Sequence, residues 1–107
     1  MFYVPLLMAA ALGVTPTFAQ DAKAGRAKAS AQCAVCHGTD GIAQLPTAAN
    51  LAGQQEVYLA KALEDFRAGR RVNEMMTVVS KDLTDADIAN LAAWYASIKI
   101  TVQVPAR

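Results

Sequence analysis

The chain has 107 residues, of which 54% are hydrophobic, and its ten Lys and Arg against nine Asp and Glu leave a formal net charge of +1. This length suits one small domain and excludes a multidomain enzyme. Because the charges are balanced and the longest basic run is Arg70-Arg71, we expect no nucleic-acid partner.

The first 20 residues carry no charged side chain. Residues 2–14 are apolar, and the segment ends on a small residue, Ala19, as signal peptides do before their cleavage site. The apolar run is shorter than the ~20 residues of a membrane-spanning helix and is interrupted by proline, so a retained anchor is the less favoured alternative. We predict a secretory signal peptide over 1–19, cleaved near Ala19, although no Lys or Arg precedes the apolar run.

The next segments alternate between helix and loop. Residues 21–33 are rich in Ala with interspersed Lys and Arg, which predicts a helix. The turn residues Gly38-Thr39-Asp40-Gly41 and the later Pro46 predict a loop over 38–53. Residues 54–68 place apolar side chains at 58, 59, 62, 63 and 66, the stripe of an amphipathic helix in which Tyr58 is a core residue. Gly69 is suited to end this helix.

The C-terminal part begins with a stretch without sustained periodicity, residues 70–83, which we expect to be irregular. Thr84-x-x-Asp87 then forms a capping box before a further helix. The buried face of that helix is predicted to consist of Ile88, Leu91, Ala92, Tyr95 and Ile98. Residues 99–107 alternate apolar and polar side chains and favour a short terminal strand. One domain over 20–98 with a C-terminal extension over 99–107 accounts for the chain after the leader.

Residues 33–37 read Cys-Ala-Val-Cys-His, the C-x-x-C-H pentapeptide that attaches c-type haem. Two thiols at this spacing can reach both vinyl groups at one porphyrin edge, while the adjacent imidazole faces the iron. The motif predicts one covalently bound haem c, with thioethers at Cys33 and Cys36 and His37 as the proximal iron ligand.

Two other uses of this motif are less consistent with the chain. A thioredoxin-like redox pair requires a strand-helix-strand context, which the pattern around residue 33 does not show. A structural zinc site requires four ligands, whereas the whole chain contains two Cys and one His.

The second axial ligand follows from the residues that remain. His37 is the only histidine, and Met75 and Met76 are the only methionines beyond the leader, so one thioether should bind the iron. Adjacent residues point in different directions, so only one of the two can serve. The alternative is that both fill gaps in the core, and periodicity does not decide between Met75 and Met76.

The chain resembles a class I c-type cytochrome over about residues 21–98, most closely the soluble bacterial monohaem cytochromes and the single domains of dihaem cytochromes c. Four blocks carry the resemblance: Gly25 ahead of Cys33, CAVCHGTDG at 33–41, LAGQQEVYL at 51–59 with DFRAGR at 65–70, and MTVVSKDLTDADI at 76–88. It implies an all-α fold, a small cytochrome c fold with about four helices around one haem c.

The resemblance also assigns individual residues. In the family the ligand methionine stands seven residues before the Leu that precedes the capping Ser or Thr, which selects Met76 as the distal ligand, with Met75 as the alternative. The first helix is implied to cross the last near Gly25 and Trp94, with Trp94 as a core residue. A backbone carbonyl near Pro46 is a candidate acceptor for the proximal imidazole proton.

Three arginines, Arg67, Arg70 and Arg71, are candidates to neutralise a haem propionate. The alternative, which we favour, is a solvated helix end that interacts with the C-terminal helix dipole.

With both axial positions filled, the expected chemistry is one-electron Fe(III)/Fe(II) exchange, so we predict a periplasmic electron carrier and not an enzyme. Its partners would be redox proteins, a dehydrogenase or cytochrome complex as donor and an oxidase or reductase as acceptor. Membrane contact would occur only through these partners, and the carrier would be a monomer. The first alternative is a dedicated cytochrome c subunit of a dehydrogenase or other oxidoreductase, docked through the 99–107 segment. The second is a haem-based sensor in which Met76 leaves the iron.

Overall fold

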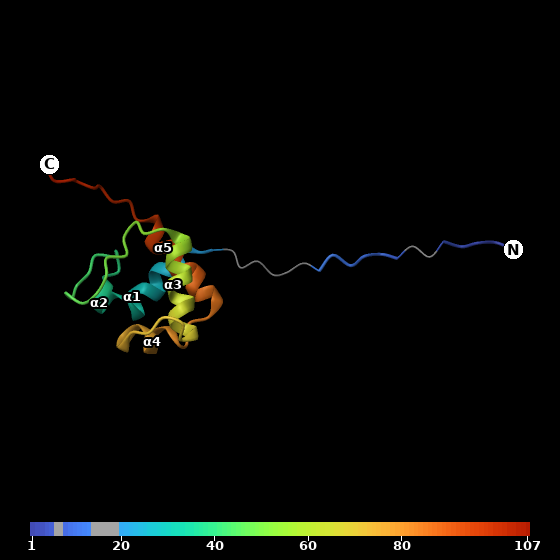
Figure 1. Cartoon of the computed structure of the whole chain (residues 1–107), viewed down its shortest axis with the longest axis horizontal. Coiled ribbons are helices and arrows are strands. Elements are labelled where there is room, and N and C mark those ends of the chain that lie inside the picture. Colours follow the sequence, from blue (N-terminus) through green and yellow to red (C-terminus); the bar gives the residue numbers. More distant parts are fainter. Residues whose placement is uncertain (6–7, 14–19) are drawn as a thin grey trace.

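The computed structural model describes residues 1–5, 8–13 and 20–107, and its secondary structure is helical. The helices are α1 (Ala22–Gln32), α2 (Ala34–His37), α3 (Glu56–Ala68), α4 (Glu74–Ser80) and α5 (Asp85–Ser97). None of these described residues forms a strand. The predicted all-α class is confirmed, with five helices in place of about four. Figure 1 shows α1, α3 and α5 gathered together, with α2 and α4 at the periphery of the group.

The closest helix contact joins α1 and α5 at Gly25. A Cβ atom at Gly25 would lie 1.9 Å from the Asn90 backbone oxygen and 2.9 Å from the Trp94 Cβ atom, so only glycine permits this approach. The crossing is also held at the start of α1, where the Asp21 N–H donates to the Asn90 Oδ1 atom at 2.9 Å. The helix crossing predicted near Gly25 and Trp94 is confirmed.

The core lies between α1, α3 and α5. Its buried hydrophobic members are Ala29, Leu59, Phe66, Leu83, Ile88, Leu91, Ala92 and Tyr95. Ile98, predicted to belong to the buried face of α5, is only partly buried because it is the residue at which the helix ends. Tyr58 is 51% exposed, so its assignment to the core is wrong. It lies at the edge of the apolar stripe of α3, where its ring faces a cavity described below.

Residues 70–83 contain a helix that the sequence did not reveal. The Asn73 side chain accepts hydrogen bonds from the backbone N–H groups of Met75 and Met76, each at 3.1 Å, and so caps the N-terminus of α4. Because α4 has only seven residues, it is too short to display an apolar period. The prediction of an irregular stretch is therefore wrong over Glu74–Ser80.

The end of α3 and the start of α5 follow their sequence signals. Gly69 adopts a φ of 77° and closes α3 in a left-handed conformation. The Thr84 hydroxyl accepts from the Asp87 N–H, and the Asp87 carboxylate accepts from the Thr84 N–H, both at 3.0 Å. The predicted capping box is confirmed.

The C-terminal segment 99–107 is exposed and has no regular secondary structure, so the predicted strand is wrong. Alternating side chains alone do not form a strand, because a strand also requires a neighbouring backbone to pair with. In Figure 1 the segment leaves the end of α5 and runs away from the helices.

The described residues of the predicted leader, 1–5 and 8–13, carry no helix or strand. The predicted cleavage site near Ala19 lies outside the described residues. No helix in the described part of the chain is long and apolar enough to cross a membrane.

Candidate functional site

A cavity of about 710 Å³ lies between the C-terminal end of α1, α2, the loop after it, α3, α4 and α5. Apolar side chains such as Leu59, Leu63, Phe66 and Leu91 form much of its wall. The same wall contains Cys33, Cys36, His37, Met75 and Met76. The structure therefore brings together, around one cavity, every residue that the sequence singled out as a haem attachment point or iron ligand.

The C-x-x-C-H segment is shaped by a single helical turn. Cys33 ends α1 and begins α2, and the His37 N–H donates to the Cys33 carbonyl oxygen at 2.9 Å. Both cysteines are free and partly buried. One helical turn places Cys33, Cys36 and His37 close together, and all three side chains line the same cavity.

The His37 ring is oriented by a backbone carbonyl. Its Nδ1–H donates to the Ala49 oxygen at 2.7 Å, and since a carbonyl can only accept, this contact leaves the Nε2 lone pair available to a metal. The predicted backbone-carbonyl acceptor is therefore present, and it belongs to Ala49, three residues after Pro46. Loop length decides which carbonyl meets the ring, and the turn residues of the sequence do not specify it.

Helix α4 supplies the two candidate thioethers on another part of the wall. Met75 is 63% exposed, whereas Met76 is partly buried. The Asn73 cap fixes the backbone of both residues at the first turn of α4. The difference in burial favours Met76 as the side chain that points into the cavity.

Two of the three arginines considered for a propionate are engaged by carboxylates elsewhere. Arg67 forms an ion pair with Asp85 at 2.7 Å and donates to the Leu83 oxygen at 3.0 Å. Arg70 pairs with Asp65 at 2.8 Å. For Arg70 the structure agrees with the favoured alternative of a solvated helix end, whereas the Arg67 side chain is only 29% exposed and is held against the start of α5.

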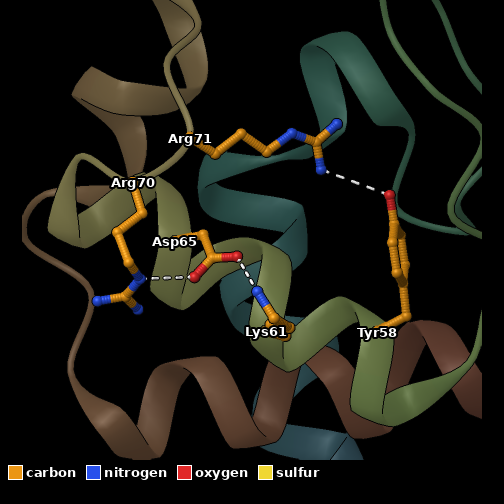
Figure 2. A network of polar contacts seen from close by, with 5 residues as sticks. All are labelled: Tyr58, Lys61, Asp65, Arg70 and Arg71. Carbon is orange, nitrogen blue, oxygen red and sulfur yellow. Dashed lines mark hydrogen bonds and ion pairs between the residues drawn. The ribbon is translucent and has the colours of Figure 1, made fainter.

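Arg71 differs from its neighbours because it lines the cavity. Its guanidinium lies 4.7 Å from the centroid of the Phe66 ring and donates to the Tyr58 hydroxyl at 3.4 Å. Figure 2 shows this side chain directed at Tyr58 and away from the Asp65 carboxylate, which is held by Lys61 and Arg70. Hydrogen bonds from Lys61 and then Arg70 keep the pKa of Asp65 below its usual range. Arg71 is the cation of the three that can reach a group in the cavity.

Tyr95 is a site residue that the sequence analysis placed only in the core. Its hydroxyl donates to the Gly38 oxygen at 3.0 Å, directly after the C-x-x-C-H segment. Burial raises the pKa of the Cys33 thiol, and a hydrogen bond with Tyr95 opposes that rise. Tyr95 occupies an ordinary buried position of the α5 stripe, so no local signal distinguished it.

These residues fit haem c. Two thiols at the end of one helical turn, an imidazole with a free Nε2 and a thioether beside a largely apolar cavity form the donor set of a His/Met-ligated, covalently attached haem. Among the described residues there is no group of three or more His, Cys, Asp or Glu side chains that could hold another metal ion.

Known proteins are similar to this chain in sequence. A family model described as cytochrome c oxidase, cbb3-type, subunit III matches residues 20–94. Cytochrome c4 of Pseudomonas aeruginosa is 43% identical over 99 residues, which cover 92% of this chain and 49% of that protein. Cytochrome c-554(548) of Halomonas halodenitrificans is 42% identical over 82 residues, covering 74% of this chain and 98% of that protein.

Two solved structures are also similar to this chain in fold. Reduced recombinant cytochrome c4 from Pseudomonas stutzeri superposes with a TM-score of 0.67 at 39% identity, covering 78% of this chain and 48% of that one. Thiosulfate dehydrogenase from Marichromatium purpuratum superposes with a TM-score of 0.67 at 35% identity, over 80% of this chain and 20% of that one. The chain spans about half the length of the cytochrome c4 relatives that it matches. It belongs to the class I c-type cytochromes, in the family of the cbb3-type oxidase subunit III, and its cofactor is haem c.

Proposed function

We propose that the chain is a one-electron carrier in which Cys33 and Cys36 hold haem c through thioethers, while His37 and Met76 are its two axial ligands. The observation that carries this proposal is the meeting of these four side chains around one cavity of about 710 Å³. When bound, haem c supplies reversible Fe(III)/Fe(II) exchange.

The two proposed iron ligands influence the balance between the oxidised and the reduced iron. The hydrogen bond from His37 Nδ1 to the Ala49 oxygen fixes the ring tautomer and increases the basicity of Nε2. Met76 is a weak donor to ferric iron and therefore favours the reduced state compared with a second imidazole. With His37 and Met76 both bound to the iron, no position would be left for a substrate, so the proposed chain is a carrier and not an enzyme.

Predicted export agrees with a carrier role. The uncharged first 20 residues, with an apolar run over 2–14, are the basis for proposing a signal peptide over 1–19, followed by the cytochrome domain over 20–98 and the extension over 99–107. Thioether attachment is expected in the periplasm after such export, and the partners would be redox proteins at the exposed side of the cavity. A shuttle needs rapid binding and release, which suits a small interface.

The experiment that tests this function is expression of the full chain in a host that matures c-type cytochromes. The product should remain coloured by haem staining after denaturing electrophoresis, because thioethers survive denaturation. Replacing both Cys33 and Cys36 by Ala should abolish the stain, while the matched change of the exposed Ser30 to Ala should retain it. A colourless wild-type product with two free thiols would overturn the proposal.

The second candidate function is a dedicated cytochrome subunit of an oxidoreductase. It is favoured by the likeness to a thiosulfate dehydrogenase and by the exposed apolar side chains Ile100, Val102 and Val104 in the C-terminal extension. Removal of 99–107 should then abolish co-purification with a larger subunit. A free shuttle predicts no such partner and unchanged behaviour of the shortened chain.

A further inference from the structure

The loop over residues 38–53 controls the position of the Ala49 oxygen, and both of its ends are attached to the same residue of α5. At its start, the Gly38 oxygen accepts from the Tyr95 hydroxyl at 3.0 Å. At its end, the Gly53 N–H donates to the Tyr95 backbone oxygen at 2.9 Å. One residue thus joins the first and the last position of the loop.

The neighbouring residue of α5 adds a third attachment. The Trp94 indole N–H donates to the Thr39 oxygen at 2.7 Å. The guanidinium of Arg26 lies 5.6 Å from the Trp94 ring centroid, on the side of α1. Two consecutive carbonyls after the haem-attachment segment are therefore held by two consecutive aromatic side chains.

These attachments are made by groups that have little freedom to move. Tyr95 is only 3% exposed, so its ring is held by the core. Gly38 and Gly53 have φ values of 72° and 68°. A Cβ atom at Gly38 would lie 2.6 Å from the Ile42 oxygen, and one at Gly53 would lie 3.0 Å from the Ile100 Cγ1 atom. The loop ends are tightly packed as well as hydrogen-bonded.

Backbone hydrogen bonds also connect residues in the middle of the loop to one another and to the haem-attachment segment. The Gly41 oxygen accepts from the N–H groups of Leu51 and Ala52 at 2.7 and 3.0 Å, and the Gln44 N–H donates to the Cys36 oxygen at 2.8 Å. A movement of either end is therefore passed to the segment that contains Ala49. The His37 ring responds because Ala49 supplies its Nδ1 acceptor.

We propose that Tyr95 is a positioning residue for the axial imidazole: by holding both ends of the 38–53 loop, it sets the Ala49–His37 hydrogen bond and through it the reduction potential. This inference rests on the proposed function, since it concerns His37 as an iron ligand. Tyr95 is not an iron ligand in this proposal, and its effect on the His37 ring passes through the loop.

The test is Tyr95→Phe in the haem-containing protein, which removes the hydroxyl but keeps the ring and the backbone carbonyl. We expect the His37 Nδ1–H proton to exchange with solvent about fivefold to tenfold faster by NMR, the effect of losing one neutral hydrogen bond. We also expect the reduction potential to rise, because a less basic imidazole stabilises ferric iron less. Circular dichroism should stay unchanged.

The matched control is Ser97→Ala. It also removes one hydroxyl from α5, but that hydroxyl donates to the Trp94 oxygen at 2.6 Å and not to the loop. The exchange rate of the His37 Nδ1–H proton and the reduction potential should both remain at their wild-type values. If Tyr95→Phe leaves both values unchanged, or if Ser97→Ala changes them equally, the positioning role is overturned.

A measurement on the wild-type protein covers the case in which Tyr95→Phe does not fold. If Tyr95 couples the loop ends to the ring, the Gly53 amide and the His37 Nδ1–H should show protection factors within about threefold of each other, because they open together. A His37 proton protected more than about tenfold less than the Gly53 amide contradicts the coupling. A wild-type protein without bound haem overturns the proposed function itself, and the positioning role with it, so the two failures are distinguishable.

Discussion

In the proposed function Met76 supplies the thioether ligand, and the structure shows how its position differs from that of Met75. Both methionines follow the Asn73 cap in the first turn of α4, where consecutive side chains point about 100° apart. Met75 is turned largely to solvent at 63% exposure, whereas Met76 is partly buried at the cavity.

Replacing Met76 by Ala is therefore expected to remove the sulfur-to-iron charge-transfer band of the ferric protein and to lower its reduction potential. The readouts are the far-red absorption spectrum and a redox titration. Met75→Ala is the matched control, since it removes the same group from the adjacent position and should keep the band. Loss of the band in Met75→Ala alone would contradict the assignment of Met76.

At the level of helices, the α1–α5 crossing depends on the absence of one side chain. The Cβ atom that Ala would add at Gly25 falls 1.9 Å from the Asn90 oxygen and 2.5 Å from the Asn90 carbonyl carbon. Because these are backbone atoms, the strain cannot be relieved by a rotamer change, and α1 would have to move away from α5.

Gly25→Ala should lower the free energy of unfolding by about 1–3 kcal/mol, the cost typical of overpacking a tight contact. The measurement is denaturant unfolding of the haem-containing protein. Ala27→Ser adds one atom on an exposed position of α1 and should change stability by less than about 0.5 kcal/mol. An equally small effect of Gly25→Ala would show that the crossing is looser than described.

The start of α5 links stability to pH through its capping box. Hydrogen bonding to the Thr84 backbone is the main cause that lowers the pKa of Asp87, with further contributions from the Thr84 side chain and Lys28, whereas burial acts in the opposite direction. A carboxyl with a lowered pKa stabilises the fold above its unfolded pKa of about 3.9 and loses this contribution as the pH falls through the folded value.

Unfolding free energies measured between pH 7 and pH 3 should therefore decrease less steeply in Asp87→Asn than in the wild type, because Asn cannot take up that proton. Asp82→Asn, at an exposed position between α4 and α5, should retain the wild-type slope. If Asp87→Asn and the wild type lose stability in parallel, the capping box does not contribute to acid sensitivity.

For the whole molecule, the charge balance limits how partners can be attracted. The chain has a formal net charge of +1, and ferric haem with two propionates adds about −1, so the loaded protein is close to neutral. Steering over long distances must then come from local groups. Apolar side chains near the cavity, such as Leu45 and Tyr58, are partly exposed and suit a short-lived contact more than a charged one.

Association with a redox partner is expected to slow by less than about tenfold between low and physiological ionic strength, where the Debye length shortens to about 8 Å. Stopped-flow rates across a salt series provide the measurement. A steeper decrease would indicate that a concentrated charge patch, and not the neutral surface, governs encounter.

Features that depend on neighbours in the sequence were predictable for this protein. Cys33, Cys36 and His37 belong to one pentapeptide, the Thr84–Asp87 capping box spans a single turn, and Gly69 ends α3 within the backbone of that helix. Such features need only local chain geometry, which residue type and spacing specify. The resemblance added Met76 and the Gly25 crossing, because it relates these positions to residues of a known arrangement.

Tertiary structure decided the features that depend on contacts between distant segments. The acceptor for His37 is the Ala49 oxygen, Tyr58 faces a cavity, and Tyr95 joins both ends of the 38–53 loop. The 99–107 segment has the alternation of a strand but no paired backbone beside it in the described structure. Hydrogen bonds across long sequence separations depend on how helices pack and how loops close. No local pattern of residue types encodes that geometry.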